Sequence, residues 1–250
     1  MTNSKQATVV LLHGVGLDHT MWQPLQKELG RESVALDLPG HGQQPVLREP
    51  QDLASLAKDV LGRIDESAPV HLVGFSLGAL IAQHIARFAP ERVLTLTAVN
   101  SVCQRTAEES AAVEQRLATA GERFDEGVEI AIERWYPKGH TTVPAQIIAD
   151  TKRVLAGNDL ESYLHAYAVF ARGDQQIAQE LGSITQPTLA ITGELDPGST
   201  PEMSYRLGAV VPNCTVHIVP SARHMLPVEN APALAAQLNS FFSQNEGMPS

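Results

Sequence analysis

The sequence is poor in cysteine, and this excludes a fold built on disulfide crosslinks. Its two cysteines, Cys103 and Cys214, are too few for such a framework and lack the spacing of a metal-binding pair. None of the nine histidines belongs to an H-x-x-x-H or H-E-x-x-H pair, so a zinc-binding helix is not indicated. We therefore expect a protein that needs neither a metal nor another cofactor.

Positive charge and long apolar runs are also scarce. The chain has 18 Lys and Arg against 28 Asp and Glu, which gives a formal net charge of -10 at pH 7. Such a surface repels phosphate backbones and anionic membranes. No apolar run reaches the length of a membrane span, and the first eight residues lack the basic and apolar segments of a secretory signal. These absences predict a cytoplasmic protein that binds neither nucleic acid nor membrane.

What the sequence does contain is an alternation of short apolar, β-branched runs with segments of helical periodicity, over 250 residues that suit one large α/β domain. Strands are expected at residues 8–12, 34–36, 70–73, 92–99, 188–192 and 215–219, and helices at 21–29, 53–64, 77–88, 201–211 and 231–242. The apolar stripe of the helix at 77–88 includes His84 and Phe88, which we expect in the core. This alternation predicts parallel βαβ units and hence a mostly parallel, doubly wound sheet with a short N-terminus.

The alternation stops after Asn100. From residue 104 to residue 181, charge-rich helix-forming segments follow one another without a strand between them. Because such a run does not fit a βα alternation, we expect a helical cap at residues 104–181. This cap would be inserted between two parts of one core, at residues 1–103 and 182–250, and would lie over one end of the sheet as a lid.

The segment G-F-S-L-G joins the expected strand at 70–73 to the helix at 77–88. In such a turn the central residue, Ser76, takes a strained backbone conformation, and the flanking glycines leave room for it. Its hydroxyl is then held above the edge of the sheet, beside the free N–H groups of the first helical turn. The motif indicates a nucleophilic serine, although G-x-S-x-G also occurs in ordinary glycine-rich turns.

Two other loops at the same edge of the sheet supply partners for Ser76. A serine hydroxyl needs a histidine to take its proton and a carboxylate to orient that histidine. His224 is the only histidine between the last expected strand and the last helix, and Asp196 follows the strand before. The order Ser76, Asp196, His224 is the order expected when a nucleophile elbow lies on this kind of sheet.

The oxyanion of such a reaction would be stabilised by two backbone N–H groups, those of Val15 and Leu77. The D-P-G sequence around Asp196 is also a common turn signal. Glu194 and Asp37 therefore stay as alternative acids at this point.

Five motifs, in the order H-G-V-G, D-L-P-G-H-G, G-F-S-L-G, G-E-L-D and A-R-H-M, resemble the landmarks of the α/β-hydrolase superfamily and cover nearly the whole core. The resemblance implies the α/β-hydrolase fold with Ser76 as nucleophile, His224 as base and Asp196 as the acid that orients it. It also implies that His13 and His41 have structural roles beside the oxyanion loop. The expected cap would then shape the substrate pocket.

The stretches V-V-L-L-H-G and I-E-R-W-Y-P resemble those of 3-oxoadipate enol-lactonases and related enzymes of aromatic-compound degradation. This resemblance implies a carboxylic ester hydrolase that acts, as a monomer or homodimer, on a small ester or lactone through an acyl-enzyme. Trp135 is then a candidate to line the pocket, and Arg134 or Arg105 to bind a substrate carboxylate. Each of these three residues could instead belong to the packing or the solvated surface of the cap.

Other activities of the same fold are alternatives. The chain is also similar to methyl ester esterases that act on pimeloyl groups, and C–C or C–N bonds of ring-cleavage products could be cleaved by the same residues. The synthases of 2-succinyl-cyclohexadiene carboxylate carry an arginine where this chain has Leu80, which counts against that activity. A ligand receptor or a cofactor-free oxygenase could use the fold without hydrolysis.

Overall fold

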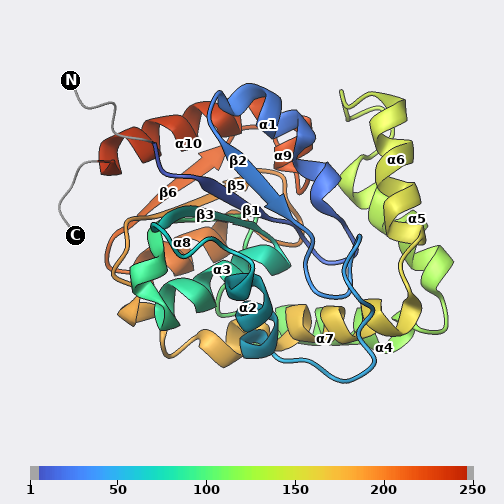
Figure 1. Cartoon of the computed structure of the whole chain (residues 1–250). Coiled ribbons are helices and arrows are strands. Elements are labelled where there is room, and N and C mark those ends of the chain that lie inside the picture. Colours follow the sequence, from blue (N-terminus) through green and yellow to red (C-terminus); the bar gives the residue numbers. More distant parts are fainter. Residues whose placement is uncertain (1–5, 247–250) are drawn as a thin grey trace.

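Figure 1 shows the computed structural model of the chain, which describes residues 6–246. The prediction of no secretory signal rests on the first eight residues, of which residues 1–5 lie outside this range. The strands are β1 (Val9–Leu12), β2 (Ser33–Leu36), β3 (Val70–Phe75), β4 (Val93–Val99), β5 (Thr188–Gly193) and β6 (Cys214–Val219). They form one sheet in the order β2-β1-β3-β4-β5-β6, and each neighbouring pair is parallel. The predicted parallel α/β sheet is confirmed.

The helices follow the strands as the alternation predicts. They are α1 (Gln23–Leu29), α2 (Leu53–Gly62), α3 (Leu77–Phe88), α4 (Ala107–Ala120), α5 (Phe124–Trp135), α6 (Ala145–Ala156), α7 (Leu160–Ile177), α8 (Pro201–Val210), α9 (Leu226–Glu229) and α10 (Ala231–Asn245). Short 3-10 helices lie at His19–Trp22, Pro90–Arg92 and Leu181–Ser183. The sequence did not predict α9, because one turn is too short to show a periodicity.

Alternate residues of each strand enter two apolar cores, one on each face of the sheet. Val10 and Leu12 of β1 belong to the core formed with α2, α3 and α8, whereas Val9 and Leu11 belong to the core formed with α1 and α10. In Figure 1, α1 and α10 lie above the sheet and α2 and α3 below it. Burial on both faces is what makes these strands continuous apolar runs.

The last turn of α3 is less buried than its periodicity predicts. Phe88 is 54% exposed and His84 is only half-buried, so their placement in the core was wrong. Their rings instead pack against each other, with centroids 4.3 Å apart. On α3 the apolar core ends at Ile85 and Ala86, and neither His84 nor Phe88 belongs to it.

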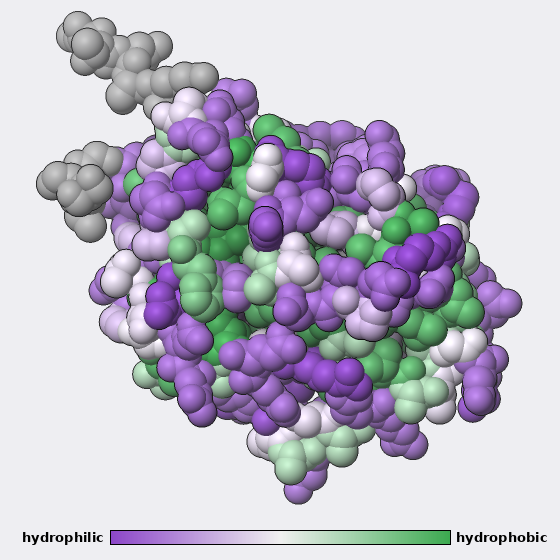
Figure 2. All heavy atoms as spheres, turned by 60° about the horizontal axis from the view of Figure 1, so that its bottom comes forward, coloured by the Kyte–Doolittle hydropathy of each residue, from purple (hydrophilic) through white to green (hydrophobic). Residues whose placement is uncertain are grey.

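Helices α4 to α7 lie between β4 and β5 in the chain, where the insertion was predicted. Helix α7 packs against α4 and also against α2 and α3 of the core, whereas α5 packs mainly against α6. Hydrophilic side chains dominate the face turned forward in Figure 2, with apolar side chains between them. Within residues 6–246, no helix has both the length and the apolar character needed to cross a membrane. The boundaries of the cap, residues 104 and 181, stay a prediction.

Candidate active site

Ser76 lies between β3 and α3 in a strained backbone conformation. Its φ of 54° and ψ of -112° are unusual for any residue other than glycine. A Cβ at Gly74 would collide with the backbone of Gly78, and a Cβ at Gly78 would collide with the carbonyl group of Leu12. The turn therefore requires glycine on both sides of the serine. The Ser76 side chain makes no capping hydrogen bond to α3, so this role does not occupy its hydroxyl.

The loop after β6 carries His224, and the loop after β5 brings Asp196 to it. The distance between His224 Nδ1 and Asp196 Oδ2 is 2.7 Å, and both residues are buried. The alternative acids are engaged elsewhere: Glu194 and Asp37 accept hydrogen bonds from backbone N–H groups of other loop residues. Of the three predicted carboxylates, the structure brings Asp196 to the histidine.

The carboxylate of Asp196 is held by hydrogen bonds on both oxygens. Oδ1 accepts the N–H groups of Gly198 at 2.8 Å and Ser199 at 3.0 Å, while Oδ2 accepts an N–H of the Asn100 amide at 2.7 Å in addition to His224. Burial alone raises the pKa of this carboxyl, but attraction to His224 and these hydrogen bonds together hold its pKa below the ordinary value. Asp196 is therefore ionised at neutral pH and fixed in orientation.

Asn100 is a residue of this site that the sequence reasoning missed. It follows β4 with a φ of 46°, a conformation that asparagine tolerates better than most residues. Its amide nitrogen lies 2.7 Å from Asp196 Oδ2 and 3.3 Å from the carbonyl oxygen of Arg223. It thus joins the loop of the acid to the loop of the histidine. Its position at a strand end, beside the other site loops, is the signal that could have revealed it.

The two predicted oxyanion donors lie in adjacent loops. The N–H of Gly78 donates to the carbonyl oxygen of His13 at 3.1 Å, which joins the serine turn to the loop after β1. Within residues 6–246, the N–H groups of Val15 and Leu77 have no hydrogen-bond acceptor. The protein therefore leaves these two backbone donors free for another acceptor.

Two buried histidines hold the loop that contains Val15. The Nε2 atom of His13 accepts the N–H of Leu38 at 2.8 Å, and that of His41 accepts the N–H of Gly16 at 2.9 Å. Burial lowers the pKa of both rings, and for His13 the neighbouring His41 adds to the effect, so that its pKa falls to about 3. Both rings are therefore neutral at pH 7, which lets their Nε2 atoms act as acceptors.

A cavity of about 380 Å³ lies over these loops, and Ser76, Asp196 and His224 all line it. We call the strand-end loops its floor and the residues of α4, α5 and α7 its roof. Trp135 belongs to the roof and stacks on His224, with ring centroids 5.8 Å apart and an angle of 24° between the planes. The roof residues that the sequence reasoning missed include Arg116, Phe124, Tyr163, Tyr167 and Phe170. The spacing of the three on α7 places them on one helix face, a signal that periodicity could have supplied.

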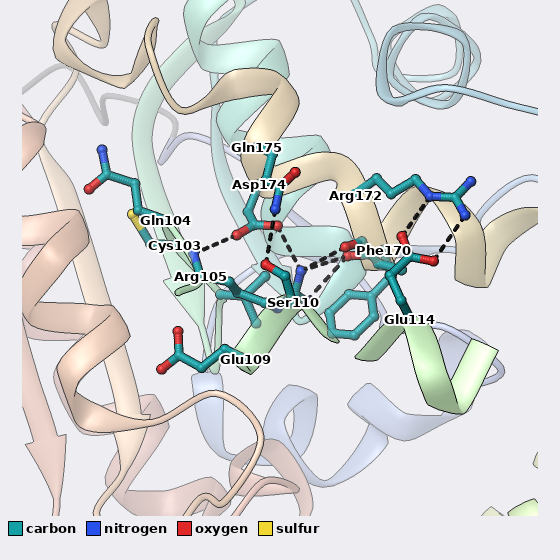
Figure 3. A network of polar contacts seen from close by, with 12 residues as sticks. Cys103, Gln104, Arg105, Glu109, Ser110, Glu114, Phe170, Arg172, Asp174 and Gln175 are labelled. Atoms are coloured by element: carbon teal, nitrogen blue, oxygen red, sulfur yellow. Dashed lines mark hydrogen bonds and ion pairs between the residues drawn. The ribbon is translucent and has the colours of Figure 1, made fainter. Parts of the chain in front are cut away.

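Arg105, predicted as a carboxylate anchor, reaches the cavity but has a partner within the protein. Its guanidinium lies 2.7 Å from Asp174, and the two side chains are only 3% and 1% exposed. It also donates to the carbonyl oxygens of Phe170 and Ala171 and stacks on the Phe170 ring at 4.7 Å. Figure 3 shows these contacts between the start of α4 and the end of α7. Asp174 thus neutralises the charge of this arginine.

Arg134, the other predicted anchor, lines the cavity and is half-buried. It forms no hydrogen bond and no ion pair with any residue in the range 6–246. Burial lowers the pKa of its guanidinium, and repulsion from Arg116 lowers it further. Of the two predicted anchors, Arg134 is the one with an unpaired charge.

Comparison with known proteins agrees with this geometry. A model described as the alpha/beta hydrolase family matches residues 9–238. The chain belongs to the alpha/beta hydrolase family. The fold and family predicted from the five motifs are thereby confirmed.

The relatives of this α/β hydrolase include metabolic hydrolases. An (E)-2-((N-methylformamido)methylene)succinate hydrolase of Acinetobacter baylyi is 30% identical over 223 residues, which cover 87% of this chain and 83% of that protein. A 3-oxoadipate enol-lactonase of the same organism is 29% identical over 196 residues, or 77% of this chain and 72% of that protein. The crystal structure of the enol-lactonase from Burkholderia xenovorans has a TM-score of 0.85 at 22% identity, covering 97% of this chain and 94% of that chain. The chain is a hydrolase, as predicted.

Proposed function

We propose that this α/β hydrolase cleaves a small ester or lactone through an acyl-enzyme formed on Ser76. The observation that carries the proposal is the placement of the Asp196–His224 pair on the same cavity as the strained Ser76 turn. The unpaired N–H groups of Val15 and Leu77 complete the set of groups that such a reaction needs.

In the first half of the reaction, Ser76 Oγ attacks the substrate carbonyl while His224 Nε2 takes the proton of the hydroxyl. Asp196 keeps the other ring nitrogen, Nδ1, protonated and stabilises the imidazolium that forms. The negative charge on the carbonyl oxygen is stabilised by the N–H groups of Val15 and Leu77. The loop that carries Val15 is fixed in advance by the neutral histidines that hold it.

The tetrahedral intermediate then collapses to the acyl-enzyme. The C–O bond to the leaving group breaks, and His224 gives its proton to the departing oxygen, which in a lactone stays attached to the acyl group. In the second half, His224 takes a proton from a water molecule that attacks the ester of Ser76. The acid product leaves, and the serine regains its proton from the histidine.

A carboxylate on the substrate would bind Arg134 rather than Arg105. Supporting this choice, Asp174 already neutralises Arg105, whereas Arg134 faces the cavity without a partner in residues 6–246. The sequence relatives are named a succinate hydrolase and a 3-oxoadipate enol-lactonase, and both names contain an acid. We therefore propose a carboxylate-bearing enol-lactone or ester, held under a cap at residues 104–181, with Trp135 over the histidine.

A C–N bond is the second candidate, because the first of these relatives has an N-methylformamido group in its name. The same residues would serve, with His224 protonating a departing nitrogen in place of oxygen. A substrate panel of enol-lactones, methyl esters and amides, compared by kcat/KM, distinguishes the two bonds.

The decisive experiment compares the wild-type enzyme with Ser76→Ala on p-nitrophenyl acetate. We expect kcat to fall by about 10⁴-fold or more, since members of such a triad act as a unit. Mass spectrometry of the quenched wild-type reaction should also show an acylated Ser76. Ser240→Ala, an exposed serine on α10, is the matched control and should keep full activity. Substantial turnover by Ser76→Ala would refute the proposal, and inactivity of both proteins would favour the receptor alternative.

A further inference from the structure

Four arginines line the cavity, and they differ in whether the protein neutralises them. Arg105 and Arg123 form ion pairs of 2.7 Å and 2.6 Å with protein carboxylates. Arg116 and Arg134 form no ion pair with any residue of the described range 6–246. A protein with a net charge of -10 thus leaves two cations in one cavity without a counter-ion.

The acidic residues of the cavity wall do not compensate for these two cations. Glu109 is 2.7 Å from Arg206, and Glu126 is 2.6 Å from Arg123. The remaining carboxylate, Asp196, belongs to His224. Since each of these carboxylates has its own partner, the charge of the unpaired arginines is left for a ligand.

The two unpaired arginines line the same cavity. Arg116 comes from α4 and Arg134 from α5, and the Nε atom of Arg116 lies 3.4 Å from the hydroxyl oxygen of Tyr167. The charge of Arg116 is the second cause, after burial, of the lowered pKa of Arg134. The cavity lining thus contains two like charges, that of the half-buried Arg134 and that of the exposed Arg116.

We infer that the cavity binds a substrate with two carboxylates, one on Arg134 and the other on Arg116 beside Tyr167. A single carboxylate would leave one cation unpaired, whereas a dianion neutralises both. The planar fork of a guanidinium matches the two oxygens of a carboxylate. The cavity volume of about 380 Å³ falls within the usual range of small-molecule sites, about 300 to 1,000 Å³. That such a substrate is hydrolysed rests on the proposed function. That it binds rests only on the charges of the cavity.

A matched ligand series on the Ser76→Ala protein separates binding from hydrolysis. Glutarate, monomethyl glutarate and dimethyl glutarate share one carbon chain and carry two, one and no charges; adipate tests a longer spacing. By calorimetry, we expect Kd to rise about tenfold or more with each charge removed, the effect of losing one hydrogen-bonded ion pair. Equal affinity for the diacids and the monoester, or no binding of glutarate or adipate, would overturn the inference.

Variants of the arginines then test the assignment. In the Ser76→Ala background, Arg116→Gln and Arg134→Gln should each weaken binding of the diacid about tenfold or more, and should reduce the preference for diacid over monoester. Arg153→Gln is the matched control, because it removes an exposed arginine that has a protein partner and does not line the cavity, and it should change Kd little. A Tm measurement checks that each variant is folded. If Arg116→Gln left Kd unchanged, the site would bind only one carboxylate, and the inference of a dianion would be wrong.

These outcomes are independent of the test of the proposed function. Hydrolysis of the neutral p-nitrophenyl acetate by the wild-type enzyme reports on Ser76 and needs no carboxylate subsite. If that activity depends on Ser76 while glutarate binds no better than its monoester, the dianion inference fails and the proposed hydrolase stands. If glutarate binds with the expected preference to a protein that hydrolyses nothing, the subsite stands and the hydrolase fails.

Discussion

The floor and the roof of the cavity differ in whether their charged groups have partners within the protein. On the floor, Asp196 accepts hydrogen bonds on both oxygens, and His41 is fixed by the loop that it supports. In the roof, Arg116 and Arg134 have no carboxylate partner within residues 6–246. Under the proposed function, the charged groups for the chemical step are preorganised, whereas those proposed for recognition await the ligand.

The largest effect should come from breaking the floor at its acid. In Asp196→Asn, the amide cannot hold Nδ1 of His224 protonated, so the ring adopts the wrong tautomer, and we expect kcat to fall by about 10⁴-fold. The measurement is kcat for p-nitrophenyl acetate. Glu194→Gln is the control, because glutamine still offers an oxygen to the N–H of Ser221, and it should lose far less activity. Equal losses in the two variants would end the assignment of Asp196.

Beside the roof, two arginine–carboxylate ion pairs differ in burial, and their contributions to the stability of the protein should differ accordingly. Asp174→Asn leaves the Arg105 charge buried without a partner, and we expect the free energy of unfolding to fall by about 3 to 5 kcal/mol. Glu126→Gln removes the partner of Arg123, whose side chain is 62% exposed, and should cost less than about 1 kcal/mol. Urea unfolding measures both. If Asp174→Asn costs as little as Glu126→Gln, Arg105 is not anchored as described and becomes a substrate anchor again.

The floor could be predicted from the sequence because its residues lie in motifs at strand ends. In a parallel sheet the carboxyl ends of neighbouring strands meet at one edge, so the loops of Ser76, Asp196 and His224 had to converge. The family resemblance favoured Asp196 over Glu194, but only one residue separates these carboxylates in the chain, and the contact with the histidine is what distinguishes them.

The roof could not be predicted to the same depth, because the state of each arginine depends on a contact between distant residues. Nothing local marks Arg105 as paired, since Asp174 lies on another helix. Helical periodicity also does not show how far along a helix neighbouring elements cover its apolar face. Phe88 was therefore placed in the core, whereas it is 54% exposed. Sequence patterns could predict which residues reach the cavity. They could not predict which of these residues have partners within the protein.

The smallest expected effect that distinguishes the floor from the roof is the loss of free energy of unfolding at acidic pH. His13 has a pKa of about 3 in the folded protein, because burial and then the charge of His41 lower it from 6.5. Between these values the unfolded chain binds more protons than the folded one, so stability falls as the pH falls below 6.5. This histidine alone should remove about 1.4 kcal/mol of the free energy of unfolding between pH 7.5 and pH 5.5.

Urea unfolding at the two pH values tests this response through His13→Asn, whose side-chain oxygen can still accept the N–H of Leu38. The loss of stability on acidification should be smaller in this variant by about 1.4 kcal/mol. His140→Asn, an exposed histidine, and Arg116→Gln in the roof should both keep the wild-type difference, since neither removes a buried neutral ring. If the free energy of unfolding of His13→Asn fell between the two pH values by as much as that of the wild-type protein, the His13 ring would already be charged in the folded wild-type protein. A charged ring cannot accept the N–H of Leu38, so the account of a floor fixed by neutral histidines would then be wrong.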